Sequence, residues 1–410
     1  MKYLPLLVFF MIFLAACSYC SASLHVETEH ISHNLTAPDG ESISLMWSGL
    51  QQLTEDGFFI GGSIIAFHDF NTNRNLILCT QPGCPHSSSL CPAYLGAGSQ
   101  YALYRGAFYA MNRRIIGFAP HYTFKYRKPS DSTWQILWEH TISAYASSNV
   151  VTVLGGGYAV ILANEFVLYD VNDTHQVYYN QLISINLETE TITELVPRHE
   201  ITDSASLLLT GVAEGKAVVF WTGFSEEILS HKEFALQALE HGISFEDATN
   251  DWFVYLEERR INRILIFNLE TGMYSEIASG KGSELLINVM NVVHNGAVFY
   301  IYNRTIFSHC LYEETTTELI YVPNLISFFV MDGKIFYTIE VDEHLYFYFY
   351  DLETSKTHHR FNEGDTEVMI LSIHHENSTA FMGIGANGNN FIIPKDDFYN
   401  ARYEQAIWLN

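Results

Sequence analysis

The feature that most constrains the fold is a two-part unit that recurs along the chain. Its first part is a glycine followed by an apolar run of strand-forming residues, and its clearest copies begin at Gly57, Gly106, Gly157, Gly215, Gly296 and Gly333. Its second part is a hairpin in which Asn/Asp-Leu-Glu-Thr joins two strands, with clear copies at 183–195, 265–277 and 348–361 and degenerate copies at 66–78 and 309–320. Asn or Asp can hold such a turn by accepting hydrogen bonds from the backbone ahead, and the alternating residues on either side fit half-buried strands. The repeats therefore predict a succession of antiparallel hairpins.

The spacing of the repeats indicates how these hairpins are arranged. Successive glycines lie 37 to 58 residues apart, except for one gap of 81 residues. Units of about 40–50 residues, each with several strands, are typical of β-propeller blades. With a further unit at 379–394, residues 41–410 are expected to form an all-β propeller of seven blades, with six or eight as alternatives. A strand at 42–47 is expected to complete the last blade. Stacked β-sandwiches are the competing architecture, although they do not require the repeated turn.

The long gap between repeats contains a segment with helical periodicity. Ser225 is a good N-cap, apolar residues at 228, 229, 235, 236 and 239 share one face, and Gly242 suits a C-terminal stop. We therefore expect one helix, near 225–242, inserted in a blade as the only long helix of the mature chain. It could cover one end of the ring or bind a partner.

The N-terminus predicts export. Residues 4–16 are uninterruptedly apolar and follow the single basic residue Lys2. At a rise of 1.5 Å per residue they would span only about 20 Å, less than the roughly 30 Å of a bilayer core, so residues 1–16 are expected to be a signal peptide. The sequence Leu14-Ala15-Ala16-Cys17 resembles the lipobox of bacterial lipoproteins. This resemblance implies that Cys17 becomes the first mature residue and carries the lipid. An ordinary secretory peptide with an incidental cysteine is the alternative.

Lipidation of Cys17 would determine where the protein works. Stable anchoring needs two or more acyl chains, such as palmitate, because a single chain binds a membrane only marginally. Residues 17–40 are polar and aperiodic after the cysteine, as expected of a flexible tether. The domain is therefore expected at the extracytoplasmic face of the cell membrane. Its formal net charge of −25 argues against nucleic acid as a partner.

The most specific local motif is a cluster of cysteines and a histidine after the first hairpin. Cys79, Cys84, His86 and Cys91 follow the spacing C-x4-C-x-H-x4-C. Three thiolates and an imidazole can form a tetrahedral zinc site. An exported protein could instead oxidise two of the thiols to a disulfide and leave the third free or paired with Cys310. Inert, separate thiols are the remaining alternative. Either crosslink would be structural, and no catalytic residue is assigned.

These features together resemble a known group of proteins. The lipobox, the segment from Leu78 to Cys91 and the hairpin repeats are similar to those of lipobox-anchored β-propeller surface lipoproteins of Gram-positive bacteria. The segment Ile393-Pro-Lys-Asp-Asp-Phe-Tyr is also similar to that group. The resemblance implies a propeller and an extracytoplasmic location, and it transfers no catalytic residue.

Two classes of function remain open. The chain contains neither Gly-x-Ser-x-Gly nor His-Glu-x-x-His, so two common hydrolase signatures are missing. We therefore expect a non-catalytic binding or scaffold lipoprotein with an unidentified protein or glycan ligand. The alternative is a surface hydrolase acting on a glycan or peptide at the mouth of the propeller. Two carboxylates about 5–10 Å apart in an aromatic-lined pocket would favour the hydrolase.

Overall fold

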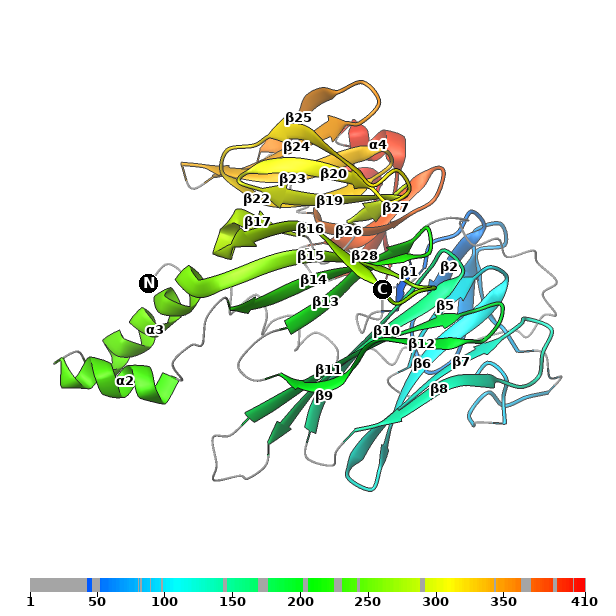
Figure 1. The fold of residues 1–410 in the computed structure, drawn as a ribbon. Coiled ribbons are helices and arrows are strands. Elements are labelled where there is room, and N and C mark those ends of the chain that lie inside the picture. Colours follow the sequence, from blue (N-terminus) through cyan, green and yellow to red (C-terminus); the bar gives the residue numbers. More distant parts are fainter. Residues whose placement is uncertain are drawn as a thin grey trace.

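The computed structural model is a seven-bladed β-propeller, as the repeats predict (Figure 1). It describes residues 43–45 and 52–409, apart from residues 80, 82, 89, 97–98, 143–145, 169–175, 202–205, 225–230, 242–243, 288–291, 343, 363–369, 386–388 and 401. The predicted signal peptide, the lipid attachment site Cys17 and the tether to residue 40 lie outside the described residues. The antiparallel sheets follow one another in sequence order around the ring.

Each blade is a short meander of consecutive strands. Blade 1 contains β2 (Gly57–Ile60), β3 (Ala66–Asp69) and β4 (Arg74–Ile77). Blade 2 contains β5 (Gln100–Tyr104), β6 (Ala107–Ile116), β7 (Ala119–Arg127) and β8 (Gln135–Thr141). Blade 3 contains β9 (Ala146–Gly155), β10 (Tyr158–Leu168), β11 (Gln176–Asn186) and β12 (Ile192–Ile201). Blade 4 contains β13 (Ser206–Ala213), β14 (Lys216–Phe224), β15 (Arg260–Asn268) and β16 (Tyr274–Lys281). Blade 5 contains β17 (Leu285–Leu286), β18 (Val293–His294), β19 (Ala297–Tyr302), β20 (Thr305–Cys310) and β21 (Thr315–Tyr321). Blade 6 contains β22 (Leu325–Met331), β23 (Lys334–Val341), β24 (His344–Asp351) and β25 (Lys356–Asn362). Blade 7 contains β26 (Ile370–Glu376), β27 (Ala380–Gly385), β28 (Asn390–Pro394) and β29 (Ile407–Leu409).

The recurring glycine has a defined place in the blade. In blade 4, Ala213 pairs with Lys216, so Glu214 and Gly215 form a two-residue turn with φ of +50° and +67°. A type I′ turn needs positive φ at both central positions, and its twist matches that of the flanking strands. Four other blades repeat this turn with a glycine at the second position: Arg105-Gly106, Gly156-Gly157, Asn295-Gly296 and Asp332-Gly333. The glycine therefore marks the start of the second strand in these blades.

The Asn/Asp-Leu-Glu-Thr motif forms the turn between the third and fourth strands. Asn186 Oδ1 accepts hydrogen bonds from the backbone N–H groups of Glu188 and Thr189, both at 3.0 Å. Asn268 Oδ1 accepts the equivalent pair, at 3.1 and 2.9 Å. The predicted role of the side chain at the turn start is confirmed.

The hydrophobic core is divided among the joints between blades. The buried apolar residues of the described chain form seven clusters, and each lies between two neighbouring blades. Between blades 1 and 2, for example, the rings of Phe59 and Phe108 meet edge to face at 5.7 Å. Because each sheet packs on both of its faces, its central strands are apolar on both sides, which accounts for the 53 tyrosines and phenylalanines.

The ring closes differently from the prediction. The short strand β1 (Ile43–Leu45) pairs with β9 of blade 3, with Ser44 opposite Val153, and the last blade is built entirely from C-terminal strands. The expectation that residues 42–47 complete the last blade is therefore wrong. The physical reason is that a three-residue strand can add to any free edge, and Ile43 is buried in the cluster between blades 2 and 3.

Blades 1 and 7 are joined by side chains instead of a shared strand. Leu53 and Phe58 of the first blade pack with Met382 of the last. Asn377 Nδ2 also donates to the Thr54 carbonyl oxygen at 2.9 Å. Packing and hydrogen bonds thus close the ring.

The insertion in blade 4 holds two helices where the sequence predicts one. The helix α2 (His231–Glu240) lies inside the predicted range, of which residues 225–230 and 242 are outside the described residues. A second helix, α3 (Phe245–Arg259), follows and runs directly into β15. Both project away from the blades (Figure 1). The described helices also include the short α4 (Lys395–Tyr399), and none of them is both long and apolar enough to cross a membrane.

Candidate metal centre

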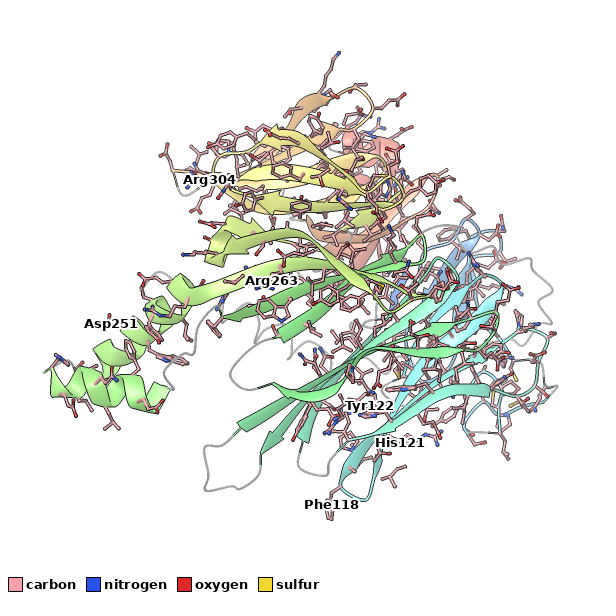
Figure 2. All side chains as sticks on the ribbon, in the orientation of Figure 1. Phe118, His121, Tyr122, Asp251, Arg263 and Arg304 are labelled. Atoms are coloured by element: carbon pink, nitrogen blue, oxygen red, sulfur yellow. The ribbon has the colours of Figure 1, made fainter. Side chains whose placement is uncertain are left out.

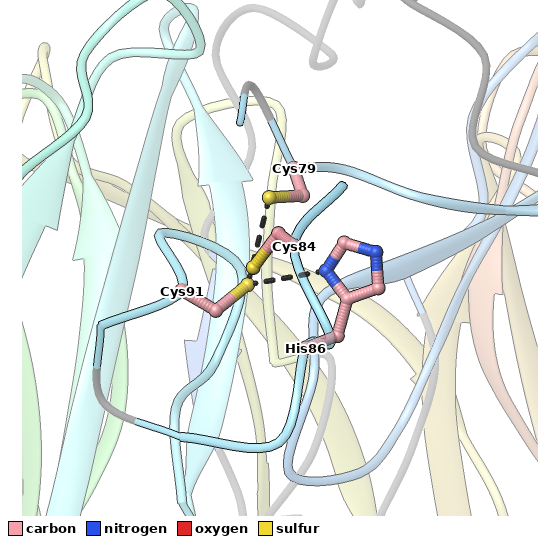
Figure 3. Close-up of side chains that lie close together, drawn as sticks. All are labelled: Cys79, Cys84, His86 and Cys91. Carbon is pink, nitrogen blue, oxygen red and sulfur yellow. Dashed lines mark hydrogen bonds between the residues drawn. The ribbon is translucent and has the colours of Figure 1, made fainter. Parts of the chain in front are cut away.

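The structure brings the four predicted ligands together in the connection between blades 1 and 2. Their ligand atoms all lie within 4.8 Å of one another (Figure 3). The sulfur of Cys91 is 3.6 Å from that of Cys79 and 3.3 Å from His86 Nδ1. In a tetrahedral site with zinc–sulfur bonds of about 2.3 Å, two sulfur ligands are about 3.8 Å apart. The cluster therefore has nearly the ligand spacing of a four-coordinate zinc site.

The backbone of the loop donates a hydrogen bond toward each of the three sulfurs. Each cysteine accepts a hydrogen bond from the backbone N–H two residues ahead, and for Cys79 the donor is Gln81, at 3.4 Å. The N–H of His86 lowers the pKa of Cys84 by this interaction. Burial raises the pKa of Cys91 to about 12, and its own backbone donor acts against that shift. Donors aimed at sulfur favour the thiolate, which is the form that binds metal.

The cluster is partly enclosed by the core between the two blades. Cys91 is 2% exposed and packs with Phe59 and Phe108, while His86 is 9% exposed. Among the described residues, His86 Nε2 is buried without a hydrogen-bond partner, whereas Nδ1 faces the Cys91 sulfur. Nδ1 is therefore the imidazole nitrogen placed to bind a metal.

Arg127 belongs to the site, although no sequence pattern pointed to it. This β7 residue is 1% exposed and donates to the carbonyl oxygens of Asp131 and Leu78, at 2.8 and 3.3 Å. Burial lowers the pKa of Arg127, and negative charge on Cys79 and Cys91 opposes that shift. Three thiolates, a neutral imidazole and a divalent ion would carry a net charge of −1, which a buried guanidinium offsets. Only the folded sheet brings Arg127 beside the loop.

The described cysteines do not form a disulfide. Cys79, Cys84, Cys91 and Cys310 are free, and the 3.6 Å between the sulfurs of Cys79 and Cys91 far exceeds a disulfide bond of about 2.05 Å. Cys310 lies in β20 of blade 5 and outside the cluster. Cys79, Cys84, His86 and Cys91 are thus placed so that they could hold a metal ion.

The structure also brings two carboxylates together, in blades 6 and 7. Lys395 Nζ lies 2.9 Å from Asp332 and 2.8 Å from Glu376. Burial alone would raise the pKa of Asp332, but hydrogen bonds from Tyr399 and Lys395 hold it below its usual range. Lys334 Nζ also lies 3.2 Å from Asp332, so two lysines balance the two carboxylates, and this group has the character of a structural ion cluster.

Comparisons with known proteins return distant similarities of fold. The chain matches no protein-family model and no curated protein sequence. Among solved structures it is similar to oligogalacturonate lyase from Vibrio parahaemolyticus, with 10% identity, a TM-score of 0.38, and coverage of 91% of this chain and 86% of the lyase. It is also similar to dipeptidyl peptidase 4 from Porphyromonas gingivalis, with 9% identity, a TM-score of 0.45, and coverage of 90% of this chain and 53% of the peptidase. A third similar structure is acylaminoacyl peptidase from Pyrococcus horikoshii, with 7% identity, a TM-score of 0.42, and coverage of 88% of this chain and 52% of the peptidase. The chain spans about half the length of these two peptidases, and none of these similarities assigns a functional residue.

Proposed function

We propose that this protein is a lipid-anchored extracytoplasmic propeller that binds a partner protein without catalysis. The observation that carries this proposal is the α2–α3 arm, residues 231–259, which stands away from the blades (Figure 1). Its exposed side chains include Leu236 at 53%, Leu239 at 48% and Val254 at 58%. Exposed apolar residues on a projecting helical element are typical of a protein-docking surface.

The two helices of the arm pack against each other, and the arm rises from a hydrogen-bonded base in blade 4. The rings of Phe234 in α2 and Tyr255 in α3 pack at 5.0 Å. At the base, Thr222 Oγ1 donates to Asn262 Oδ1 at 3.1 Å, and Asn262 Nδ2 donates to the Gly282 carbonyl oxygen at 2.7 Å. An element ordered in advance loses less conformational entropy on binding, which supports a docking role.

The membrane location rests on the N-terminal sequence. The apolar run at 4–16 and the lipobox-like Leu14-Ala15-Ala16-Cys17 support lipidation of Cys17, and the polar segment after it supports a tether. Cys17→Ser should move the protein out of the membrane fraction or leave it unprocessed. A mature N-terminus carrying an unmodified Cys17 in mass spectra would contradict the anchor.

We further propose that Cys79, Cys84, His86 and Cys91 hold a structural zinc ion. Four protein ligands fill a tetrahedral site and leave no open position for substrate, which is characteristic of structural zinc. The ion would tie the long connection between β4 and β5 to the core between blades 1 and 2, which already contains Cys91.

The hydrolase alternative receives less support from the side chains. Lys395 bridges the carboxylates of Asp332 and Glu376, so neither is a free acid or base. The three exposed apolar residues of the arm suit binding better than bond cleavage.

The docking role can be tested with a photo-crosslinking amino acid placed in the full chain in its producing cells. Substitution at Leu239 should give one discrete adduct, and substitution at Tyr312 should give none. Tyr312 is a matched control because it is 83% exposed on the turn between β20 and β21. Leu236→Lys with Val254→Lys should abolish the Leu239 adduct. Equal adducts at both sites, or none at either, would contradict the proposed docking role.

A further inference from the structure

The hairpin between β6 and β7 extends well beyond its blade. β5 pairs with β6 only as far as Met111, and β8 pairs with β7 only from His121 onward. Pro120 is buried and its carbonyl oxygen accepts a hydrogen bond from the backbone N–H of Ile142. Residues 113–119, here named the blade-2 ribbon, therefore form a two-stranded extension without a flanking strand. At about 3.3 Å per residue, its tip lies roughly 20 Å beyond Met111. Phe118 is at this tip and points away from the ring (Figure 2).

The tip of the ribbon is apolar and exposed. Ile115 and Ile116 are each 59% exposed, and Phe118 is 84% exposed. Successive strand residues point to opposite faces, so Ile115 and Ile116 make both faces of the ribbon apolar. Gly117, with a φ of +65°, occupies the first position of the two-residue turn, as in a type II′ hairpin, and sets Phe118 at the apex. A ribbon that packed one face on the ring would instead alternate apolar and polar residues.

Positive charge lies directly behind the apolar tip. Arg113 and Arg114 precede Ile115, and Arg114 is exposed. These are two of only 21 basic residues in a chain with a net charge of −25. An apolar tip followed by arginines suits a phospholipid surface, because the tip can enter the acyl boundary while the guanidinium groups stay among the phosphates.

We propose that the blade-2 ribbon inserts its tip into the surface of an anionic phospholipid bilayer. Ile115, Ile116 and Phe118 enter the interface, and the exposed Arg114 lies at the level of the lipid phosphates. The setting rests on the proposed anchor at Cys17, because residues 18–42 would reach at most about 85 Å and keep the ribbon close to the membrane. The ribbon would then fix the orientation of a propeller that the tether alone leaves free.

The proposal can be tested by tryptophan fluorescence in the full chain. Phe118→Trp and the control Tyr312→Trp are reconstituted into vesicles of phosphatidylcholine and phosphatidylglycerol, with bromine on the acyl chains. The emission of the new tryptophan is obtained by subtracting the wild-type spectrum. Trp at position 118 should shift to the blue and be quenched at least about twofold. Trp at position 312 should show neither effect. In an antiparallel meander, the turn between the third and fourth strands, such as β20–β21, lies at the opposite end of the blade from the turn between the second and third strands, such as β6–β7.

Two further experiments test the apolar and charged parts of the ribbon. Ile115→Ser with Ile116→Ser should remove the quenching at position 118, and vesicles without phosphatidylglycerol should reduce it. These residues are exposed, so an unchanged circular dichroism spectrum is expected. Quenching at position 118 no greater than at 312, in protein that floats with the vesicles, would overturn the proposal and leave the tip free for a protein partner.

The outcome is separable from that of the anchor. The mass of the mature N-terminus decides whether Cys17 is lipidated. The fluorescence of the ribbon is read in protein that floats with the vesicles, so a failed anchor, seen as an unmodified Cys17 and protein that does not float, is distinguished from a failed ribbon.

Discussion

Removing one sulfur from the cysteine–histidine cluster should abolish metal binding and lower the stability of the propeller. Cys91→Ser is the sharpest change, because the Cys91 sulfur is 2% exposed and within 3.6 Å of both Cys79 and His86. Cys310→Ser is the matched control, because this free cysteine is outside the cluster. We expect about one zinc ion per chain in the wild type and in Cys310→Ser, and far less than one in Cys91→Ser.

The expected loss of stability follows from linkage. An ion present at a hundredfold excess over its Kd stabilises the folded state by about 2.7 kcal/mol. At about 2.1 cal/mol/K per residue, a domain of roughly 370 residues has an unfolding entropy of about 0.8 kcal/mol/K, so the change corresponds to about 3–4 °C in Tm. The serine hydroxyl adds a separate cost in a buried position, so the response to a chelator is the better measure of the metal contribution.

The assay combines metal analysis with thermal unfolding in the presence and absence of a chelator. The chelator should lower the Tm of the wild type and of Cys310→Ser by about 3–4 °C, and it should leave Cys91→Ser unchanged. Metal-free wild-type protein in which Cys79, Cys84 and Cys91 all titrate as free thiols would refute the reasoning. An equal chelator response in Cys91→Ser would refute it as well.

Three further predictions concern the fold. Glu165 has a side chain 2% exposed and lies 2.8 Å from His140 and 3.0 Å from Arg198. Burial alone would raise its pKa, but the hydrogen bonds from His140 and Arg198 hold it below the usual value. Its contribution to stability is therefore present above about pH 4.3 and is lost as pH falls through the folded-state pKa. In urea unfolding at pH 7, Glu165→Gln should lower the free energy of unfolding by about 3–5 kcal/mol. The control Glu139→Gln changes a half-exposed side chain and should lower it by less than about 0.5 kcal/mol. Equal effects of the two substitutions would contradict the role of burial. The Cβ added by Gly215→Ala would meet no atom within 4 Å, so the substitution should lower the free energy of unfolding by about 1–2 kcal/mol through the φ of +67° alone. Glu214→Gly should stabilise the same turn. A Gly215→Ala variant as stable as the wild type would argue against the turn assignment. Met382→Ala, at the joint between blades 7 and 1, should lower the free energy of unfolding by about 2–5 kcal/mol in the same assay. Met273→Ala, at a residue that is 72% exposed, should have little effect. A Met382→Ala variant as stable as the wild type would mean that this joint does not hold the ring.

Much of the fold was predictable because its signals are local. A type I′ turn needs positive φ at fixed positions, so glycine recurs at 106, 157, 215, 296 and 333, where a first strand turns into a second in five of the seven blades. Asn186 and Asn268 hold their turns with atoms only two or three residues ahead. Such short-range requirements repeat in every copy, and counting the copies gave the seven blades.

The helical insertion was predicted only in part. The segment around α2 has an apolar periodicity and a following glycine that mark it as a helix. The segment of α3, Phe245–Arg259, has an apolar periodicity similar to that of α2, because Phe245, Trp252 and Leu256 are spaced to share one face, but it lies beyond the glycine taken as the stop. In the structure α3 packs against α2, with the rings of Tyr255 and Phe234 in contact.

The side chains that could form the candidate metal site were predictable from the sequence, because the spacing of Cys79, Cys84, His86 and Cys91 allows a short loop to gather four ligands. It left the choice between a metal and a disulfide open, since that choice depends on how the loop packs against its neighbours. The tertiary structure placed Arg127 beside the thiols, added β1 to blade 3 instead of blade 7, and left the blade-2 ribbon uncovered. Each of these outcomes depends on contacts between segments far apart in the chain, which no local pattern specifies.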